Sequence, residues 1–235
     1  MTDAPMSDST TLSLPDNASL LTRLRVARQC LDVLKNDPTN PTAGQLINIC
    51  LDLKVYASIV QRFQRSEEGR RLLSERPSLQ GKELDLTELE RLPEGSLGHA
   101  FARYFRDNKI SPFETTLELK NDVDFIGKRY RETHDLLHVL TGYGTDVMGE
   151  MEVQAYALGN LGIRTAVLIL LFGAVENLKN RQTRVGLSEY VRRVRAAYRR
   201  GRTSQQFLSF GFERHWATPV ASLSAQLCAP AARMN

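Results

Sequence analysis

Residues 130–150 read YRETHDLLHVLTGYGTDVMGE, and within them His134 and His138 stand four positions apart. Side chains at positions i and i+4 of a helix lie on the same face, so both imidazoles can point at one ion. Asp135 is rotated from the first histidine by about a quarter-turn or more, since a helix has about 3.6 residues per turn. Asp135 can therefore ligate only from the flank of the site, or orient a ligand from outside it.

A short turn that contains glycine explains how Glu150 can return to these histidines. Gly142 and Gly144 interrupt the apolar periodicity where a helix would end, because glycine tolerates the left-handed backbone of a helix C-cap. Thr145 is the expected N-cap of a second helix. We therefore expect two antiparallel helices, with the histidines on one and Glu150 facing them from the other.

These side chains form a donor set of the kind that binds a divalent metal ion. Two imidazole nitrogens and one or two carboxylate oxygens suit zinc, and a set of two histidines and one carboxylate also suits non-haem Fe(II). Zinc is favoured, with iron and magnesium as alternatives. The zincin signature has Glu where this chain has Asp, so protease chemistry is disfavoured. The predicted metal ligands are His134, Asp135, His138 and Glu150. The other two histidines, His99 and His215, are expected to be structural.

The pattern H-D-x-x-H, followed after eleven residues by E, closely resembles a known family. It is that of the fourth of the coenzyme Q (ubiquinone) biosynthesis proteins, found in mitochondria and in many bacteria. Residues 91–102, RLPEGSLGHAFA, also resemble the L-P-x-G-S/T-L-G segment of that family, and the two motifs stand in the expected order. With residues 56–63 and the Arg-Gly-Arg around Gly201, the similarity spans most of the chain after the first forty residues.

The resemblance implies a step on the aromatic ring of a prenylated benzoquinone precursor. The ring carbon that carries a carboxylate would lose it and gain a hydroxyl, which is a metal-dependent oxidative decarboxylation. The catalytic residues implied are His134, Asp135, His138 and Glu150. Arg129 and Arg131 are candidates to pair the substrate carboxylate, and for each of them a solvent-facing role is the alternative.

The chain departs from many relatives downstream of Glu150. Those relatives often carry Lys four residues later and then an acid, whereas this chain has Gln154 and Ala157. This difference leaves the metal set untouched and puts any role of a Lys-acid pair in doubt.

Two other functions stay open. One is a non-enzymatic, prenyl-lipid-binding organiser that recruits other ubiquinone biosynthesis enzymes around a structural metal. The other is a metal phosphohydrolase, which would need a further distant histidine and aspartate. The implied partners are a prenylated quinone precursor, a membrane surface, the other enzymes of the pathway and, as an open alternative, a second copy of the chain.

Helical periodicity dominates the chain, so we expect an all-α fold. Helices are predicted from residues 19 to 35, from about residue 42 onward, and from 66 to 79. Ser96 is the expected cap of a further helix that carries Phe101, Tyr104 and Phe105, and these three aromatics are expected in the core. Residues 207–227 are expected to form a last helical region, with Trp216 as a core anchor. We expect a single-domain helical bundle over residues 19–235, after a disordered segment over residues 1–18.

Two later segments carry distinctive patterns. Residues 166–175 have no polar face, which predicts either a central helix of the bundle or a helix that lines a tunnel for an isoprenoid tail. Residues 188–202 combine six arginines with apolar positions. Such a basic helix is a solvated face or lies on anionic lipid. Nucleic acid is not an expected partner, since no recognition motif accompanies the arginines.

Composition places the chain among ordinary globular proteins, with a formal charge of +4 from 31 basic and 27 acidic residues. Cys30, Cys50 and Cys228 are widely spaced and odd in number, which indicates buried free thiols in a reducing compartment. The most apolar run is about half of the roughly 20 residues that a membrane-spanning helix requires. We therefore expect a protein of the bacterial cytoplasm that is peripheral to the inner face of the membrane and has no transmembrane segment.

Overall fold

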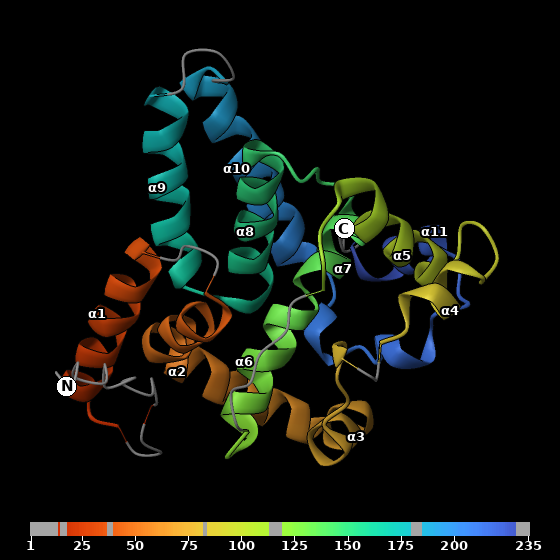
Figure 1. Ribbon diagram of the computed structural model, residues 1–235, viewed down its shortest axis with the longest axis horizontal. Helices are drawn as coiled ribbons and strands as arrows, with labels where there is room; N and C mark the ends of the chain where they lie inside the picture. Colours follow the sequence, from red (N-terminus) through yellow and green to blue (C-terminus); the bar gives the residue numbers. More distant parts are fainter. Residues whose placement is uncertain are drawn as a thin grey trace, which may run out of the picture.

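The computed structural model describes residues 14, 18–36, 40–81, 84–112, 119–179 and 185–228, so nearly all of the segment predicted to be disordered lies outside it. Every regular element within these ranges is a helix, which confirms the all-α class (Figure 1). The α-helices are α1 (Leu20–Asn36), α2 (Pro41–Arg65), α3 (Glu67–Glu75), α4 (Leu86–Glu90), α5 (Leu97–Asn108), α6 (Asp122–Glu132), α7 (His134–Thr141), α8 (Val147–Leu161), α9 (Thr165–Lys179), α10 (Leu187–Thr203) and α11 (Val220–Leu227).

Several helices begin where a serine caps them. The hydroxyls of Ser19, Ser66 and Ser96 accept hydrogen bonds from backbone N–H groups three residues later, at 3.2, 3.0 and 3.4 Å. A side-chain oxygen in this place satisfies one of the N–H groups that the first helical turn leaves free. The starts of α1, α3 and α5 were therefore readable from the sequence.

The C-terminal segment differs from the single helical region that was predicted. Only α11 is α-helical, and before it come two short 3-10 turns, η2 (Phe207–Ser209) and η3 (Phe212–Arg214). The backbone there bonds to the start of α5 instead: Leu97 N–H donates to Thr218 O, and Gly98 N–H to Trp216 O, both at 2.8 Å. Trp216 does act as an anchor, since its ring stacks on Phe101 at 5.6 Å.

Helices α8 and α10 pack at very close range. A Cβ added to Gly159 of α8 would lie 2.2 Å from Tyr198 O, and one added to Gly201 of α10 would lie 2.2 Å from Tyr156 O. Only glycine permits backbones to approach so closely. The contact fixes α8, the helix that carries Glu150, against the rest of the fold.

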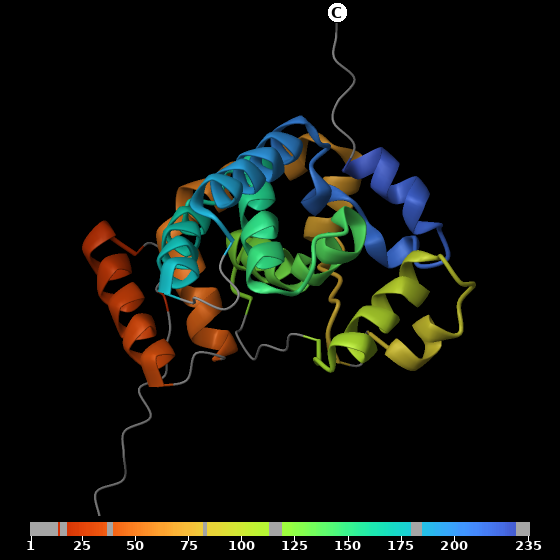
Figure 2. The ribbon, with the colours of Figure 1, turned by 90° about the horizontal axis from the view of Figure 1, so that it is seen from above.

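Helix α9 contradicts the prediction that it lies at the centre of the bundle. It lies at one side of the molecule, beside α8 and near α1 (Figures 1 and 2). Its small residues face inward, since Ala166 is fully buried and a Cβ on Gly173 would overlap the sulfur of Met151 at 2.2 Å. Six of its large apolar residues are exposed rather than enclosed in a tunnel, while Ile169 and Leu170 are half-buried against α8 and α10. The six exposed residues are Val167, Leu168, Leu171, Phe172, Val175 and Leu178.

Helix α1 shows the same arrangement. Its buried side consists of Val26, Ala27 and Cys30, whereas four of its leucines are exposed. The exposed leucines are Leu20, Leu21, Leu24 and Leu31. In both helices the side with small residues packs inward, because it allows closer contact than a row of leucines.

By length and composition, the stretch Thr42–Arg65 of α2 could cross a membrane, with a mean hydropathy of 1.2 and 47% of that window buried inside the fold. A helix packed in a protein core passes the same test. That the chain has no transmembrane segment therefore stays a prediction.

Asp52 joins α2 to α9. It lies at a kink in α2, with φ −109° and ψ 17°, and is fully buried. Its carboxylate accepts hydrogen bonds from Arg164 N–H at 2.7 Å, Thr165 N–H at 2.9 Å and the Thr165 hydroxyl at 2.5 Å. Asp52 thus caps the start of α9 from another helix, which fixes where α9 begins.

We expect Asp52→Ala to lower the free energy of unfolding by about 2–4 kcal/mol, since it leaves buried N–H groups without an acceptor. Denaturant titration followed by circular dichroism measures the loss. Asp107→Ala is the control, because Asp107 pairs at the surface with exposed Arg103 and Arg106, and such ion pairs contribute little to stability. Equal losses in the two variants would contradict the capping role.

Candidate metal centre

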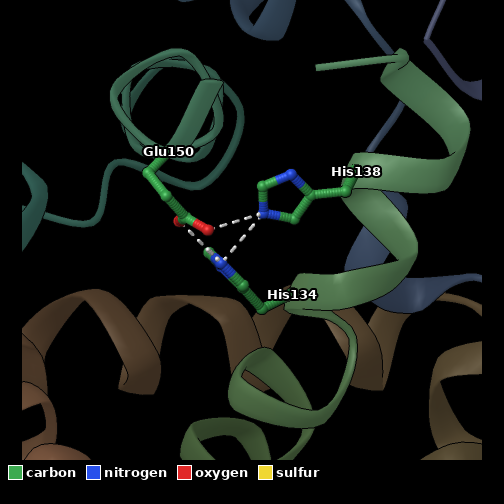
Figure 3. A group of neighbouring side chains, drawn as sticks. All are labelled: His134, His138 and Glu150. Carbon is green, nitrogen blue, oxygen red and sulfur yellow. Dashed lines mark hydrogen bonds and ion pairs between the residues drawn. The ribbon is translucent and has the colours of Figure 1, made fainter. Parts of the chain in front are cut away.

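The structure brings three of the four predicted ligands together. His134 and His138 project from α7, and Glu150 meets them from α8 (Figure 3). One carboxylate oxygen lies 3.3 Å from His134 Nε2, the other lies 3.2 Å from His138 Nε2, and the two nitrogens are 3.4 Å apart. Separations of this size match neighbouring donors around a tetrahedral ion held at about 2.0–2.1 Å. The residues present therefore fit a divalent metal ion.

Two local signals place α7 and α8. Gly142 ends α7 in the left-handed conformation, with φ 75°, as its position in the sequence predicted. The cap of α8 is Asp146, which accepts from Gly149 N–H at 2.7 Å, so the prediction of Thr145 was wrong. The Thr145 hydroxyl donates instead to Asn108. Figure 3 shows α8 nearly end-on and α7 running across the view, so the helices cross rather than lie antiparallel.

The backbone of the turn that follows α7 sets the orientation of the His138 ring. Its Nδ1 lies 3.1 Å from the carbonyl oxygen of Tyr143, so Nδ1 carries the proton and Nε2 turns a lone pair to the site. His134 and His138 are only 7% and 3% exposed, whereas the side chain of Glu150 is 37% exposed. The group is thus open to solvent on the side of Glu150.

The three groups polarise one another. Burial raises the pKa of Glu150, but the hydrogen bonds and charges of both imidazoles outweigh it and hold that pKa well below its ordinary value. Burial lowers the pKa of His138, and the Glu150 carboxylate outweighs it, so the pKa of His138 is raised. A protonated imidazole beside a carboxylate is the arrangement that a bound cation would replace.

Asp135 lies outside this group of ligands. Its carboxylate accepts a hydrogen bond at 3.4 Å from the hydroxyl of Tyr104, whose ring stacks on His138 at 5.6 Å. The sequence left open whether Asp135 binds the metal from the flank of the site or orients a ligand from outside it. The structure favours the second role. Tyr104 was predicted only as a core aromatic. The signal that could have revealed its role is a hydroxyl next to the apolar core residue Phe105, since a buried hydroxyl needs a partner.

The two candidate substrate arginines lie in different surroundings. Arg129 is completely buried, and its guanidinium donates to Leu208 O, Phe210 O and the Glu213 carboxylate at 2.6–2.8 Å. It therefore ties α6 to the C-terminal segment and is open neither to a substrate nor to solvent. Arg131 is exposed, and it lies close enough to Tyr104 for its charge to oppose the rise that burial causes in the pKa of that phenol.

The other two histidines have structural partners, as predicted. His99 Nδ1 lies 2.9 Å from Glu90 O, and His215 Nδ1 lies 3.4 Å from the Thr218 hydroxyl. Among the described residues, the group at α7 and α8 is the one cluster of His, Cys, Asp and Glu with donor atoms close enough to hold a metal. The additional ligands of a phosphohydrolase do not join it. The three cysteines are buried and free, which confirms that prediction.

Removal of single ligands tests the group of three. We expect about one zinc per chain in the wild type after loading, and far less in His134→Ala and Glu150→Ala, by elemental analysis. Asp135→Asn should keep the stoichiometry and weaken the affinity by about 10–100-fold, the usual effect of a residue that orients a ligand. Complete loss of zinc in Asp135→Asn would instead make Asp135 a ligand.

The pKa of His138 predicts opposite pH dependences for the metal-free and the loaded protein. Because the pKa of His138 is raised, the pairing of its protonated ring with Glu150 stabilises the metal-free fold fully at pH values below the ordinary pKa of 6.5. This stabilisation disappears as pH rises through the pKa that His138 has in the folded state. Metal needs the neutral imidazole, so affinity should weaken about tenfold per pH unit below that pKa. The rise in Tm on adding zinc should be larger at pH 8 than at pH 6, by thermal denaturation. An equal rise at both would argue against His138 as a ligand.

Three comparisons identify similar proteins. The family model described as coenzyme Q (ubiquinone) biosynthesis protein Coq4 matches residues 37–230. The mitochondrial ubiquinone biosynthesis protein COQ4 homolog of Rattus norvegicus is 33% identical over 71% of this chain and 62% of its own length. The Bos taurus homolog is 28% identical over 94% of this chain and 84% of its own length. A crystal structure of a candidate ubiquinone biosynthesis protein from Nostoc punctiforme superposes with a TM-score of 0.68 at 25% identity, covering 88% of this chain and 96% of that one.

The chain spans less than two thirds of the length of the rat relative, while the family model covers most of the chain itself. The resemblance seen in residues 91–102 and 134–150 is therefore confirmed along the fold as a whole. This chain belongs to the Coq4 family of coenzyme Q (ubiquinone) biosynthesis proteins.

Proposed function

We propose that this chain carries out a metal-dependent step on the ring of a prenylated benzoquinone precursor during ubiquinone biosynthesis. The step is the replacement of a ring carboxylate by hydroxyl. The observation that carries the proposal is the group of two buried imidazoles and one half-exposed carboxylate, with donor atoms within 4.8 Å of one another. Family membership indicates the pathway, and this group of side chains supports a metal-dependent reaction.

The metal would be held by His134, His138 and Glu150, with Asp135 orienting the site from outside. Zinc is favoured by the donor set and the separations, and iron or magnesium are the alternatives. When bound, the ion supplies a Lewis acid that stabilises negative charge developing on a ring oxygen. Family members that carry all four of these residues would share this metal-dependent chemistry.

The remaining roles belong to residues around the open side of the group. Arg131 is the remaining candidate to pair the substrate carboxylate, because it is exposed and lies near Tyr104. Tyr104 would keep His138 in place by stacking. An ionised ring carboxylate and water give a hydroxylated ring, carbon dioxide, one proton and two electrons. The reaction therefore needs an oxidant, which is dioxygen or another electron acceptor.

The same proposal places the protein in the bacterial cytoplasm, at the inner face of the membrane where a long prenyl tail resides. The partners proposed with it are the prenylated precursor and the other enzymes of ubiquinone biosynthesis. The basic helix α10 supports a peripheral position, since its exposed arginines suit anionic headgroups.

The test replaces His134 or Glu150 by Ala in a host that depends on this chain for ubiquinone. An enzyme predicts that the carboxylated, prenylated precursor accumulates at least about tenfold, by mass spectrometry, while the variants stay folded by circular dichroism. His215→Ala is the matched control, because it removes an imidazole away from the site. Normal quinone levels in both site variants would contradict the enzymatic proposal and favour a lipid-binding organiser with a structural metal.

A further inference from the structure

Helix α9 presents a row of large apolar side chains to solvent. Leu168, Leu171, Phe172 and Val175, here called the α9 stripe, are 57%, 61%, 67% and 48% exposed. Their spacing places them on one side of the helix, and residues 165–175 include no charged residue. Single exposed leucines are normal on protein surfaces, but a contiguous row marks a surface that contacts something apolar.

The stripe is held in place by the packing on the opposite side of α9. Asp52 caps the first turn, and Gly173 lies directly against Met151 of α8. Further along, the hydroxyl of Tyr190 donates to Leu170 O at 2.7 Å and ties α9 to α10. Rotation of α9 to bury the stripe would break all three contacts. The stripe is therefore a fixed feature of the surface.

Helix α10, which contacts α9, also exposes both apolar and basic side chains. Leu187 and Val191 are 54% and 42% exposed, and Arg195 and Arg199 follow at steps of four residues, both exposed. Residues at this spacing lie along one side of a helix. Arg192 is exposed as well, but it pairs with Glu189. Within the described part of the chain, no salt bridge joins Arg195 or Arg199 to an acid.

Helix α1 adds the same two kinds of side chain nearby. Both views place it beside α9, on the side of the molecule opposite α5 (Figures 1 and 2). Leu21 and Leu24 are 75% and 50% exposed, and Arg25 and Arg28 are exposed next to them. Exposed leucines and arginines thus recur on neighbouring helices at one side of the fold.

We propose that this side of the molecule docks on an anionic lipid bilayer through α9 and α10. The α9 stripe enters the boundary between headgroups and acyl chains, and Arg195 and Arg199 contact lipid phosphates. An apolar row next to unpaired basic residues is the pattern of a helix that lies in a membrane interface. The inference rests on the peripheral position proposed above and assigns the surface that produces it.

A lipid surface fits this side better than a second copy of the chain. In a symmetric dimer each copy offers the same patch to the other, so both sets of arginines would gather at one interface. Helix α10 itself carries one acid, Glu189, and Arg192 already occupies it. A bilayer that contains anionic lipid supplies phosphates along its whole surface.

The docked orientation would also bring lipid near the metal group. The inner side of α9 packs on Met148 and Met151, which flank Glu150 on α8. Only one helix therefore separates the α9 stripe from the residues next to a metal ligand. A substrate whose tail stays in the bilayer would then have its ring close to the site.

Vesicle sedimentation tests the surface with the full chain. We expect binding to vesicles of equal parts phosphatidylcholine and phosphatidylglycerol, and little binding to phosphatidylcholine alone. Leu171→Gln with Phe172→Gln should weaken binding at least about tenfold, because it removes the apolar contact. Arg195→Gln with Arg199→Gln should weaken it by about 25-fold at low salt, since each basic residue near the surface contributes about fivefold.

Matched controls lie on the opposite side of the molecule. Ile110→Gln removes one exposed apolar side chain there, and Arg103→Gln with Arg106→Gln removes two exposed arginines of α5. Both should bind as the wild type does. Equal loss in the controls, or full binding by the α9 and α10 variants, would overturn the proposal. So would a wild-type dimer, seen by light scattering, that ignores vesicles and dissociates in the Leu171 and Phe172 variant. Glu150→Ala should bind vesicles normally, so failure of the metal chemistry would leave this result standing.

Discussion

The contact between Glu150 and the two imidazoles of α7 is the constraint on which the candidate metal site depends. A carboxylate that is half removed from water is unfavourable unless positive charge or hydrogen-bond donors face it. His134 and His138 supply those donors at 3.2–3.3 Å, and the shift in the pKa of Glu150 shows that they outweigh its burial. The turn at Gly142, the cap at Asp146 and the tight packing of α8 on α10 all serve to keep this contact in place.

Much of this site could be predicted from the sequence because its parts are close together in the chain. The spacing of the two histidines and a turn of a few residues leave Glu150 little freedom to lie elsewhere. Serine caps were readable for the same reason, since each acts within one turn. Partners that are remote in sequence were not readable. Arg129 bonds to groups about 80 residues away, and nothing in residues 129–131 distinguishes it from exposed Arg131.

The direction in which α9 and α1 face could not be predicted either, for a different physical reason. Hydrophobic periodicity identifies the buried side of a helix only where a polar side exists for contrast. Residues 166–175 offer none, and steric fit then decides, so that Gly173 and Ala166 turn inward. In α1 the leucines form the more obvious stripe, yet the smaller Ala27 and Cys30 pack against α2.

These reversals have a common consequence for function. A fold that buries small residues and exposes leucine and phenylalanine loses hydrophobic stabilisation in water, at roughly 25 cal/mol for each Å² left exposed. Hydrogen bonds such as those that Asp52 accepts at the start of α9 offset part of that loss and keep α9 from rotating. The exposed row is then available to an apolar environment outside the protein. The same helix thus separates the candidate metal ligands, which need charge and hydrogen bonds, from the exposed apolar row.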